Sequence, residues 1–302
     1  MQRRQLLAAG LVAAAALPNL AQAETPSAPK LKPRRPVVTA DGARLFVRDW
    51  GAGKPIVFLA GWTLTSDMWA YQMSPLCDQG FRCVAYDRRG HGKSDDPGQG
   101  YDFDTLADDL AAVLDALDLR DVTLVAHSMA GGEATRYLTR HGKAGRVNKV
   151  LYLAPTLPCL TRSADNPMGV PAEMFELNRK VLMTDFPKWI EDNTEPFVLP
   201  STSQPMRTWV QAMMRQASMK AVIDCNRAMT AADFRPELKA LKVRALVIHG
   251  DKDASAPLEL TGRPAAALIP GCELKVYAGA PHGLFVTHMA PLNADIAAFA
   301  KA

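Results

Sequence analysis

The chain has 302 residues, of which 48% are apolar and 22% are charged, and its formal net charge at pH 7 is +4. This length supports one large domain with a sizeable core, and the composition is ordinary for a water-soluble protein. This charge is close to balanced, so nothing in the composition implies nucleic acid or an anionic surface as a partner.

Residues 1–23 have the pattern of an export signal. Arg3 and Arg4 precede an uncharged apolar run at 6–17, and small residues before Glu24 form a cleavage site. The run is too short for a stable membrane span, so we expect no membrane insertion after cleavage and a periplasmic or secreted mature chain. The paired arginines also fit a twin-arginine signal, and ordinary secretion stays open beside that route.

A linker is predicted at 24–36, where proline and lysine are frequent. Short apolar runs then alternate with amphipathic ones. We expect strands at 45–50, 56–60, 81–86, 122–126 and 147–153, and helices at 66–79, 103–117 and 129–140. Buried runs that are each followed by a helix are typical of a parallel sheet with helices on both faces.

The alternation breaks between 159 and 235, where only helix-like segments occur. It resumes with strands at 243–249 and 273–277, a helix through 267 and a last helix at 290–300. We therefore predict an α/β fold with a doubly wound, mostly parallel sheet. Its core comprises 37–158 and 236–302, and a helical lid at 159–235 interrupts it.

Eight of the thirteen methionines lie in the predicted lid. They leave two interpretations open, an adaptable apolar pocket and ordinary packing. The five cysteines are an odd number and form no CxxC motif, which argues against a zinc or redox site. Export would permit a Cys159–Cys225 disulfide, and buried free thiols are the simpler alternative.

A nucleophile is predicted at Ser128, where the strand at 122–126 gives way to a helix. A serine at such a junction sits on a sharp turn with its hydroxyl exposed, and small residues on either side let strand and helix approach. The usual pattern is G-x-S-x-G, whereas this chain has Ala126 and Ala130 at the outer positions. A serine that caps the helix is the alternative.

A serine hydroxyl needs a base to activate it and donors for the oxyanion that forms. One donor should be the backbone N–H of Met129, the residue after the predicted nucleophile. The other should come from the loop after 56–60, where Gly61 lets the backbone turn and Trp62 is placed to donate its N–H. The Trp62 indole would then line the pocket, unless it is a core tryptophan.

His282 is the best candidate for the base among six histidines. It lies in a loop just after the last strand, where an open parallel sheet gathers its site, and we favour it over His288. The acid should lie between serine and histidine in chain order, and both Asp251 and Asp253 follow a strand there. A buried carboxylate would orient the imidazole and stabilise its cation.

Other polar residues receive structural interpretations. His127 precedes the predicted nucleophile, and we expect it to point elsewhere from its strand. The loop at 88–94 ends in G-K-S, but a phosphate-binding loop needs a glycine where Asp87 stands, so this loop is expected to be structural. No H-E-x-x-H motif or carboxylate cluster indicates a metal.

The chain resembles the cofactor-free haloperoxidases and aryl esterases of the α/β-hydrolase superfamily from about Val37 to its end. The most specific stretches are 60–69, 86–95, 127–132, 225–238, 247–253 and 275–288. The resemblance implies an α/β-hydrolase fold with an inserted helical lid.

The same resemblance implies roles for five residues. Ser128 matches the nucleophile and His282 the base, while the second aspartate of the G-D-x-D segment, Asp253, matches the acid. Trp62 and Met129 match the oxyanion donors. Two departures are visible, because the family usually has a histidine where Ala60 stands and glycines on both sides of the elbow serine.

The activity implied is hydrolysis of carboxylic esters of small or aryl alcohols through an acyl-enzyme, with no cofactor. Hydrogen peroxide in place of water would yield a peracid, which oxidises halide without metal or haem. A carbon–carbon bond hydrolase or lyase with the same triad is one alternative, and a receptor-like ligand-binding protein with weak hydrolysis is another. We expect a small-molecule ester as the partner, and an oligomer is compatible with the sequence.

Overall fold

The structure is a computed structural model and describes residues 36–302. The predicted signal at 1–23 lies outside the described residues, as does all of the predicted linker except residue 36, so both stay predictions. Among residues 36–302, no helix combines the length and apolar character needed to cross a bilayer.

A seven-stranded sheet forms the centre, in the order β3-β5-β4-β6-β7-β8-β9. Its strands are β3 (Val47–Gly51), β4 (Pro55–Leu59), β5 (Arg82–Tyr86), β6 (Val122–His127), β7 (Val147–Leu153), β8 (Arg244–Gly250) and β9 (Glu273–Tyr277). Only β3 at the edge runs antiparallel to its neighbour, and the other pairs are parallel. The predicted mostly parallel sheet is confirmed.

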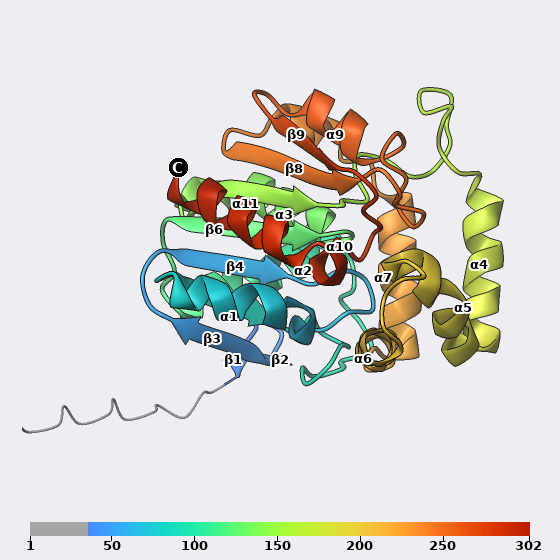
Figure 1. The fold of residues 1–302 in the computed structure, drawn as a ribbon, viewed down its shortest axis with the longest axis horizontal. Coiled ribbons are helices and arrows are strands. Elements are labelled where there is room, and N and C mark those ends of the chain that lie inside the picture. Colours follow the sequence, from blue (N-terminus) through green and yellow to red (C-terminus); the bar gives the residue numbers. More distant parts are fainter. Residues whose placement is uncertain (1–35) are drawn as a thin grey trace, which may run out of the picture. The chain divides into compact units, whose positions relative to one another are not determined.

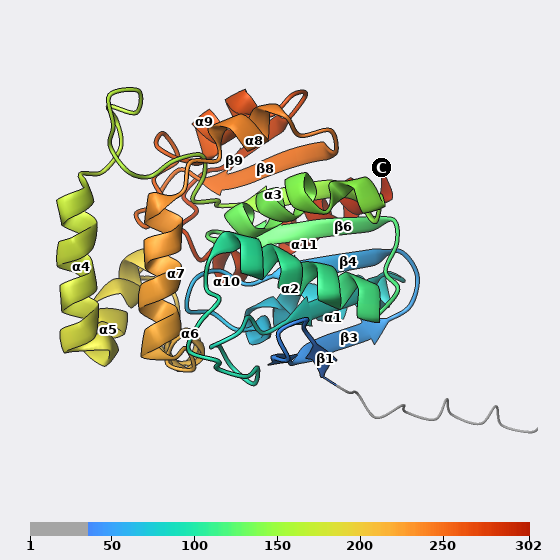
Figure 2. The ribbon, with the colours of Figure 1, turned by 180° about the vertical axis from the view of Figure 1, so that it is seen from behind.

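Helices cover both faces of this sheet. In Figure 1, α1 (Ala70–Asp78) and α11 (Met289–Lys301) lie in front, and Figure 2 shows α2 (Phe103–Ala116) and α3 (Ala130–Arg140) on the other face. The shorter helices are α8 (Arg235–Lys239), α9 (Gly262–Leu268) and α10 (Leu284–Thr287), with 3-10 turns at Ser66–Trp69 and Gly142–Ala144. The predicted doubly wound arrangement is therefore confirmed.

Alternation along the central strand β6 explains why both faces must be covered. All six of its residues are buried. Val125 packs into the core beneath α1 and α11, whereas Leu124 and Ala126 pack into the core beneath α2 and α3. Successive side chains of a strand point to opposite faces, so a strand that is apolar on both sides needs a layer of helices on each.

Two predicted elements differ in detail from the structure. The predicted strand at 45–50 is broken at Phe46, where the chain passes from a small β1–β2 ribbon (Val37–Val38 and Arg44–Leu45) to the main sheet. The predicted helix at 66–79 begins as a 3-10 turn and becomes helical only from Ala70. These differences arise because pairing partners and terminal turns are tertiary features that apolar periodicity does not contain.

A helical segment separates β7 from β8, as the predicted fold requires. It contains α4 (Ala172–Thr184), α5 (Phe186–Val198), α6 (Gln204–Met214) and α7 (Met219–Ala231). Asp185, Ser203 and Ser218 cap α5, α6 and α7 by accepting a backbone N–H. Figure 1 shows the four helices beyond the carboxyl ends of the parallel strands, so they form a lid over that edge.

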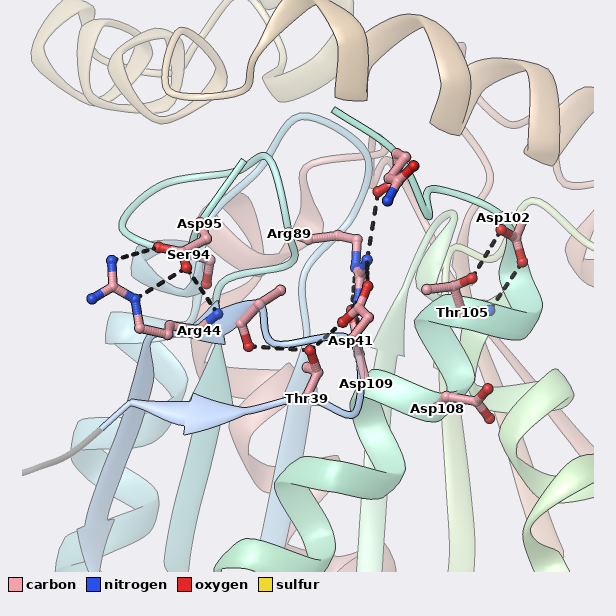
Figure 3. A network of polar contacts seen from close by, with 12 residues as sticks. Thr39, Asp41, Arg44, Arg89, Ser94, Asp95, Asp102, Thr105, Asp108 and Asp109 are labelled. Carbon is pink, nitrogen blue, oxygen red and sulfur yellow. Dashed lines mark hydrogen bonds and ion pairs between the residues drawn. The ribbon is translucent and has the colours of Figure 1, made fainter. Parts of the chain in front are cut away.

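Arg89 anchors the loop after β5 through hydrogen bonds to two aspartates. The Arg89 guanidinium bonds both oxygens of Asp109 on α2 at 2.7 and 2.6 Å, and both oxygens of Asp41 at 2.8 and 3.2 Å (Figure 3). Hydrogen bonds from Arg89 keep the pKa of Asp41 well below its usual range. The loop at 88–94 has structural contacts here, in agreement with its interpretation from the sequence.

The cysteines, all of which lie within residues 36–302, are free thiols. The Cys159–Cys225 disulfide that export would permit is absent from the structure. The alternative of buried free thiols holds for Cys83 and Cys225, whereas the other three thiols are partly exposed. Cys225 is fully buried, and this burial raises the pKa of its thiol to about 12. A thiol with so high a pKa is almost entirely protonated at neutral pH and is a poor nucleophile.

Candidate active site

Ser128 occupies the sharp turn that the sequence predicts between β6 and α3. Its φ of 57° lies in the left-handed region, which costs a non-glycine residue about 1–2 kcal/mol. Its N–H donates to the Leu153 carbonyl on β7 at 2.9 Å, and this bond holds the turn in place. Ala126 and Ala130 are completely buried, so the two alanines supply the small contact surface that glycines usually provide.

The structure brings Ser128, His282 and Asp253 together from distant parts of the chain. His282 Nε2 lies 2.9 Å from Ser128 Oγ, and His282 Nδ1 lies 2.6 Å from Asp253 Oδ2. All three residues are at most 6% exposed. The order serine, imidazole, carboxylate is the arrangement in which a histidine can accept the serine proton while a carboxylate stabilises the resulting cation.

Both oxygens of the Asp253 carboxylate have donors. Oδ1 accepts from the backbone N–H groups of Ser255 at 2.9 Å and Ala256 at 2.7 Å. Burial opposes the charged form, but His282, His249 and the backbone donors outweigh it and lower the pKa of Asp253 below its ordinary value. The carboxylate is therefore ionised at neutral pH, as an orienting residue requires.

Asp251, the other candidate acid, has a different place. Its Oδ1 accepts the Gly279 N–H at 2.6 Å, and the residue is exposed. This bond ties together the loops that follow β8 and β9. Of the two aspartates that the sequence left open, only Asp253 reaches His282.

His249 is a contact of Asp253 that the sequence reasoning missed. Its Nε2 lies 2.8 Å from the Ala256 carbonyl oxygen and 3.1 Å from Asp253 Oδ2. A carbonyl oxygen only accepts, so Nε2 carries the proton and points it at both acceptors. The sequence did contain a signal for this contact. His249 ends a buried strand four residues before Asp253, and a buried imidazole needs a polar partner.

His127 does not point away from the site, so that expectation was wrong. Its Nε2 lies 3.1 Å from the His282 carbonyl oxygen, and the two rings have centroids 4.7 Å apart. Burial lowers the pKa of His127 to about 3, so the ring is neutral at neutral pH. The side chain turns back across the elbow because it holds the backbone of the loop that carries His282.

The loop after β4 lies directly against the serine turn. A Cβ at Gly61 would be 2.5 Å from His127 Nδ1 and 3.3 Å from the Ser128 Cβ, so only glycine fits there. Among residues 36–302, the backbone N–H groups of Trp62 and Met129 make no hydrogen bond. These donors, one on each side of the predicted nucleophile, are free for a ligand.

Arg88 connects that loop to α3. Its Nη2 donates to the Ala60 carbonyl at 2.7 Å and to Glu133 Oε2 at 2.8 Å. Both charged side chains are almost completely buried. The family usually has a histidine where Ala60 stands, but the group that Arg88 holds here is the backbone carbonyl, which any residue supplies.

A cavity of about 300 Å³ opens between Ser128 and the lid. Trp62 lines it, with its ring held by an Nε1 bond of 2.9 Å to the Val222 carbonyl on α7 and an edge contact to Trp189. Of the eight lid methionines, Met214 and Met229 line the cavity. Four others are exposed, namely Met168, Met174, Met183 and Met219. A methionine-lined pocket is therefore the wrong interpretation for most of them.

Within the part of the chain that the structure describes, no three His, Cys, Asp or Glu side chains are grouped so that they could hold a metal ion. His282 and Asp253 instead lie in line with Ser128. This order of contacts suits proton transfer from Ser128 to His282.

A family model described as alpha/beta hydrolase fold matches residues 54–289. The chain belongs to the α/β-hydrolase family. This α/β hydrolase is 42% identical over 255 residues to a non-heme chloroperoxidase of Kitasatospora aureofaciens, covering 82% of this chain and 91% of the relative. The predicted resemblance to cofactor-free haloperoxidases is thereby confirmed.

Two further similarities agree with this placement. The α/β hydrolase is 34% identical over 275 residues to a bifunctional esterase/perhydrolase of Acinetobacter calcoaceticus, covering 88% of this chain and 99% of that protein. Its fold matches the crystal structure of a bromoperoxidase from Bacillus anthracis with a TM-score of 0.85 and 33% identity, covering 89% of this chain and 100% of the other.

Proposed function

We propose that this α/β hydrolase is a serine hydrolase that cleaves carboxylic esters of small or aryl alcohols through an acyl-enzyme. The observation that carries the proposal is the pair of contacts from Ser128 Oγ through His282 to Asp253, at 2.9 and 2.6 Å. The names of the relatives, which include an esterase/perhydrolase, support the same chemistry.

In the first half-reaction, His282 Nε2 takes the Ser128 proton as Oγ attacks the ester carbonyl. The N–H groups of Trp62 and Met129 stabilise the oxyanion, since one such donor is worth about 10²–10³ in rate. His282 then protonates the leaving alcohol as its bond to the acyl carbon breaks. The acyl group remains on Ser128.

In the second half-reaction, His282 takes a proton from water, whose oxygen attacks the acyl carbon. The bond to Ser128 Oγ breaks, the serine regains its proton, and the carboxylic acid leaves. Hydrogen peroxide can take the place of water, and the product is then a peracid. The peracid transfers one oxygen atom to a halide and becomes the carboxylic acid, which accounts for haloperoxidase activity without a metal or haem.

We also propose that the protein is exported. The support is the sequence of residues 1–23, with its paired arginines, apolar run and small-residue cleavage site. Expression of the full chain in a bacterium, followed by fractionation and determination of the N-terminal residue, should yield a periplasmic or secreted product that begins near Glu24. A chain that starts at Met1 and stays in the cytoplasm would overturn this part of the proposal.

The test of the catalytic proposal is hydrolysis of phenyl and 4-nitrophenyl acetate by the mature chain, compared with Ser128→Ala. We expect turnover by the wild type, loss of turnover in S128A, and labelling of Ser128 by a fluorophosphonate. Ser201→Ala, at an exposed lid position, is the matched control and should retain the wild-type rate.

Two outcomes would contradict the catalytic proposal. Turnover by folded S128A at the wild-type rate would exclude Ser128 as the nucleophile. A folded wild type that hydrolyses no ester across several acyl lengths would exclude the esterase, and a carbon–carbon bond hydrolase or a ligand-binding protein would then account for the site. In a mixture of enzyme, acetate, peroxide and bromide, a dye should be brominated only when acetate is present. That dependence on acetate would support the formation of a peracid.

A further inference from the structure

Asn226 on α7 presents an amide whose orientation is fixed by its neighbour. The side chain is 3% exposed and lines the same cavity as Ser128 and Trp62. Its Oδ1 accepts from Arg179 Nη1 at 2.7 Å. A guanidinium can only donate, so the amide oxygen faces Arg179 and the amide nitrogen faces the other way. Within residues 36–302, that nitrogen has no hydrogen-bond partner.

Asn178 on α4 also has its amide oriented by a neighbouring donor. Its Oδ1 accepts the Trp189 indole N–H at 3.1 Å, and an indole nitrogen can only donate. The amide nitrogen of Asn178 is therefore also left over, and among the described residues it has no partner. Asn178 lines the cavity together with Asn226, so two NH₂ groups are available to a ligand in one enclosed space.

Arg179 is itself held firmly, which makes the orientation of Asn226 a rigid feature. It is 5% exposed and bonds Glu176 through Nη2 at 2.6 Å and Thr230 through Nη1 at 3.2 Å. The carboxylate of Glu176 balances the charge of the guanidinium. The ion pair of Arg179 and Glu176 therefore adds no net positive charge to the cavity, and the two asparagine donors are neutral.

The position of Asn226 relates these donors to the catalytic chemistry. The carbonyl of Val222, one turn earlier on α7, holds the Trp62 indole at 2.9 Å. The backbone N–H of Trp62 is a proposed oxyanion donor. The cavity that contains Ser128 is also lined by Asn226, so a substrate whose carbonyl lies between Trp62 and Met129 can reach the free amide on α7. Asn226 is buried and Asn178 is partly buried, and donors in such places are normally paired, so an apolar group there would leave both amide nitrogens without an acceptor.

We propose that Asn226 and Asn178 form a subsite for a neutral oxygen acceptor, a ketone, ester or ether oxygen, on the part of the substrate that lies under the lid. This inference rests on the proposed esterase function and narrows it to esters with a second oxygen function remote from the scissile carbonyl. Two uncharged NH₂ groups match a neutral acceptor better than a carboxylate, which would need a cation for its desolvated charge.

The experiment compares 4-nitrophenyl hexanoate with 4-nitrophenyl 5-oxohexanoate, and hexyl acetate with 5-oxohexyl acetate, so that both sides of the ester are sampled. In at least one pair we expect the wild type to prefer the oxygenated member about tenfold or more in kcat/KM, the scale expected when a site pairs otherwise unpaired polar groups. The adipate half-ester, which carries a carboxylate, should be poorer than the neutral ketone.

Asn226→Asp and Asn178→Asp are the decisive variants. Each keeps an oxygen to accept from Arg179 or Trp189 and replaces the free NH₂ by an acceptor. We expect the preference to fall toward unity in each. Asn193→Asp is the matched control, because Asn193 lines the same cavity but its amide nitrogen already donates to the Trp189 carbonyl at 2.8 Å. This control should keep the preference.

Equilibrium binding to Ser128→Ala, followed by tryptophan fluorescence, separates the two proposals. The oxygenated ester should bind more tightly than its plain counterpart, and the difference should disappear in S128A/N226D. Equal binding and equal kcat/KM within both pairs, or a preference that survives in both aspartate variants, would overturn the subsite. Selective binding by a wild type that turns over no ester would leave the subsite in place and overturn the esterase.

Discussion

The guanidinium of Arg88 donates to the backbone carbonyl of Ala60 at 2.7 Å, from a position that is almost completely buried. The same guanidinium bonds Glu133 in the first turn of α3. Arg88 therefore sets the distance between the loop that carries the Trp62 N–H and the helix that follows Ser128. Arg88 Nη1 also donates at 3.4 Å to the Gly61 carbonyl, which belongs to the same peptide group as the Trp62 N–H. The separation of the two proposed oxyanion donors therefore depends on Arg88, although Arg88 bonds neither N–H group.

The first prediction concerns Arg88→Lys. Lysine keeps the charge but lacks the planar fork that reaches Ala60 and Glu133 together. We expect kcat for aryl acetates to fall about tenfold or more, because a misplaced oxyanion donor can cost about 10²–10³. KM should change much less.

Arg82→Lys is the control for Arg88→Lys. Arg82 on β5 makes two bonds of 2.9 Å to the Asp49 carboxylate on the edge strand β3. An R88K enzyme that is folded and keeps the wild-type kcat would contradict a positioning role for Arg88.

The second prediction concerns Gly61→Ala. The added methyl would be 2.5 Å from His127 Nδ1, so the loop or the imidazole must move. Either movement disturbs the Trp62 N–H or the loop that carries His282, and we expect a loss of about 10²-fold or more in kcat. Gly142→Ala, where a Cβ meets nothing within 4 Å, should leave kcat unchanged. Equal activities of the two variants would refute the close packing of loop and elbow.

The third prediction concerns His249→Leu. The change removes the Nε2 donor 3.1 Å from Asp253 Oδ2, so the pKa of Asp253 should rise. A hydrogen bond to a charged group is worth about 1.5–3 kcal/mol, and we expect kcat to fall about tenfold or more. As the pH is lowered, the variant should also lose activity at a higher pH than the wild type does. His288→Leu is the control, because it alters the candidate base that was not favoured. It should not shift the pH at which activity is lost on the acid side.

The fourth prediction concerns the pH dependence of stability. Burial lowers the pKa of His91 from 6.5 to about 3, and burial does the same for His127. The unfolded chain therefore binds protons below pH 6.5 that the folded chain excludes until about pH 3, so the free energy of unfolding should decrease as pH falls through this window. Each histidine contributes a slope of up to about 1.4 kcal/mol per pH unit.

Denaturant melts of the wild type and of His91→Phe between pH 4 and 8 test this pH dependence. Below pH 6, the free energy of unfolding of H91F should depend less steeply on pH than that of the wild type. The difference in slope should correspond to about one bound proton. Above pH 7 both histidines are neutral in the folded and unfolded states, so the two proteins should show parallel curves there. Parallel curves across the whole range would mean that His91 does not contribute.

The sequence by itself determined the layers of this protein and two of the three residues at the centre of its candidate site. Buried β-branched runs such as Val122–His127 predict strands covered on both faces whatever their partners, because the period of the side chains is local. Ser128 and His282 could be selected because each follows a strand, and the carboxyl ends of parallel strands meet at one edge. Asp251 and Asp253 both follow β8, so only the family resemblance indicated Asp253.

Only the tertiary structure decided which polar groups support those residues. His249, Arg88 and Glu133 carry no motif, and their contacts depend on a few ångströms of packing between separate elements. The direction of His127 was predicted wrongly for the same reason. The free amides of Asn178 and Asn226 depend on Trp189 and Arg179, donors whose reach no spacing rule predicts. Periodicity constrains faces and edges, whereas hydrogen-bond partners are chosen by three-dimensional proximity.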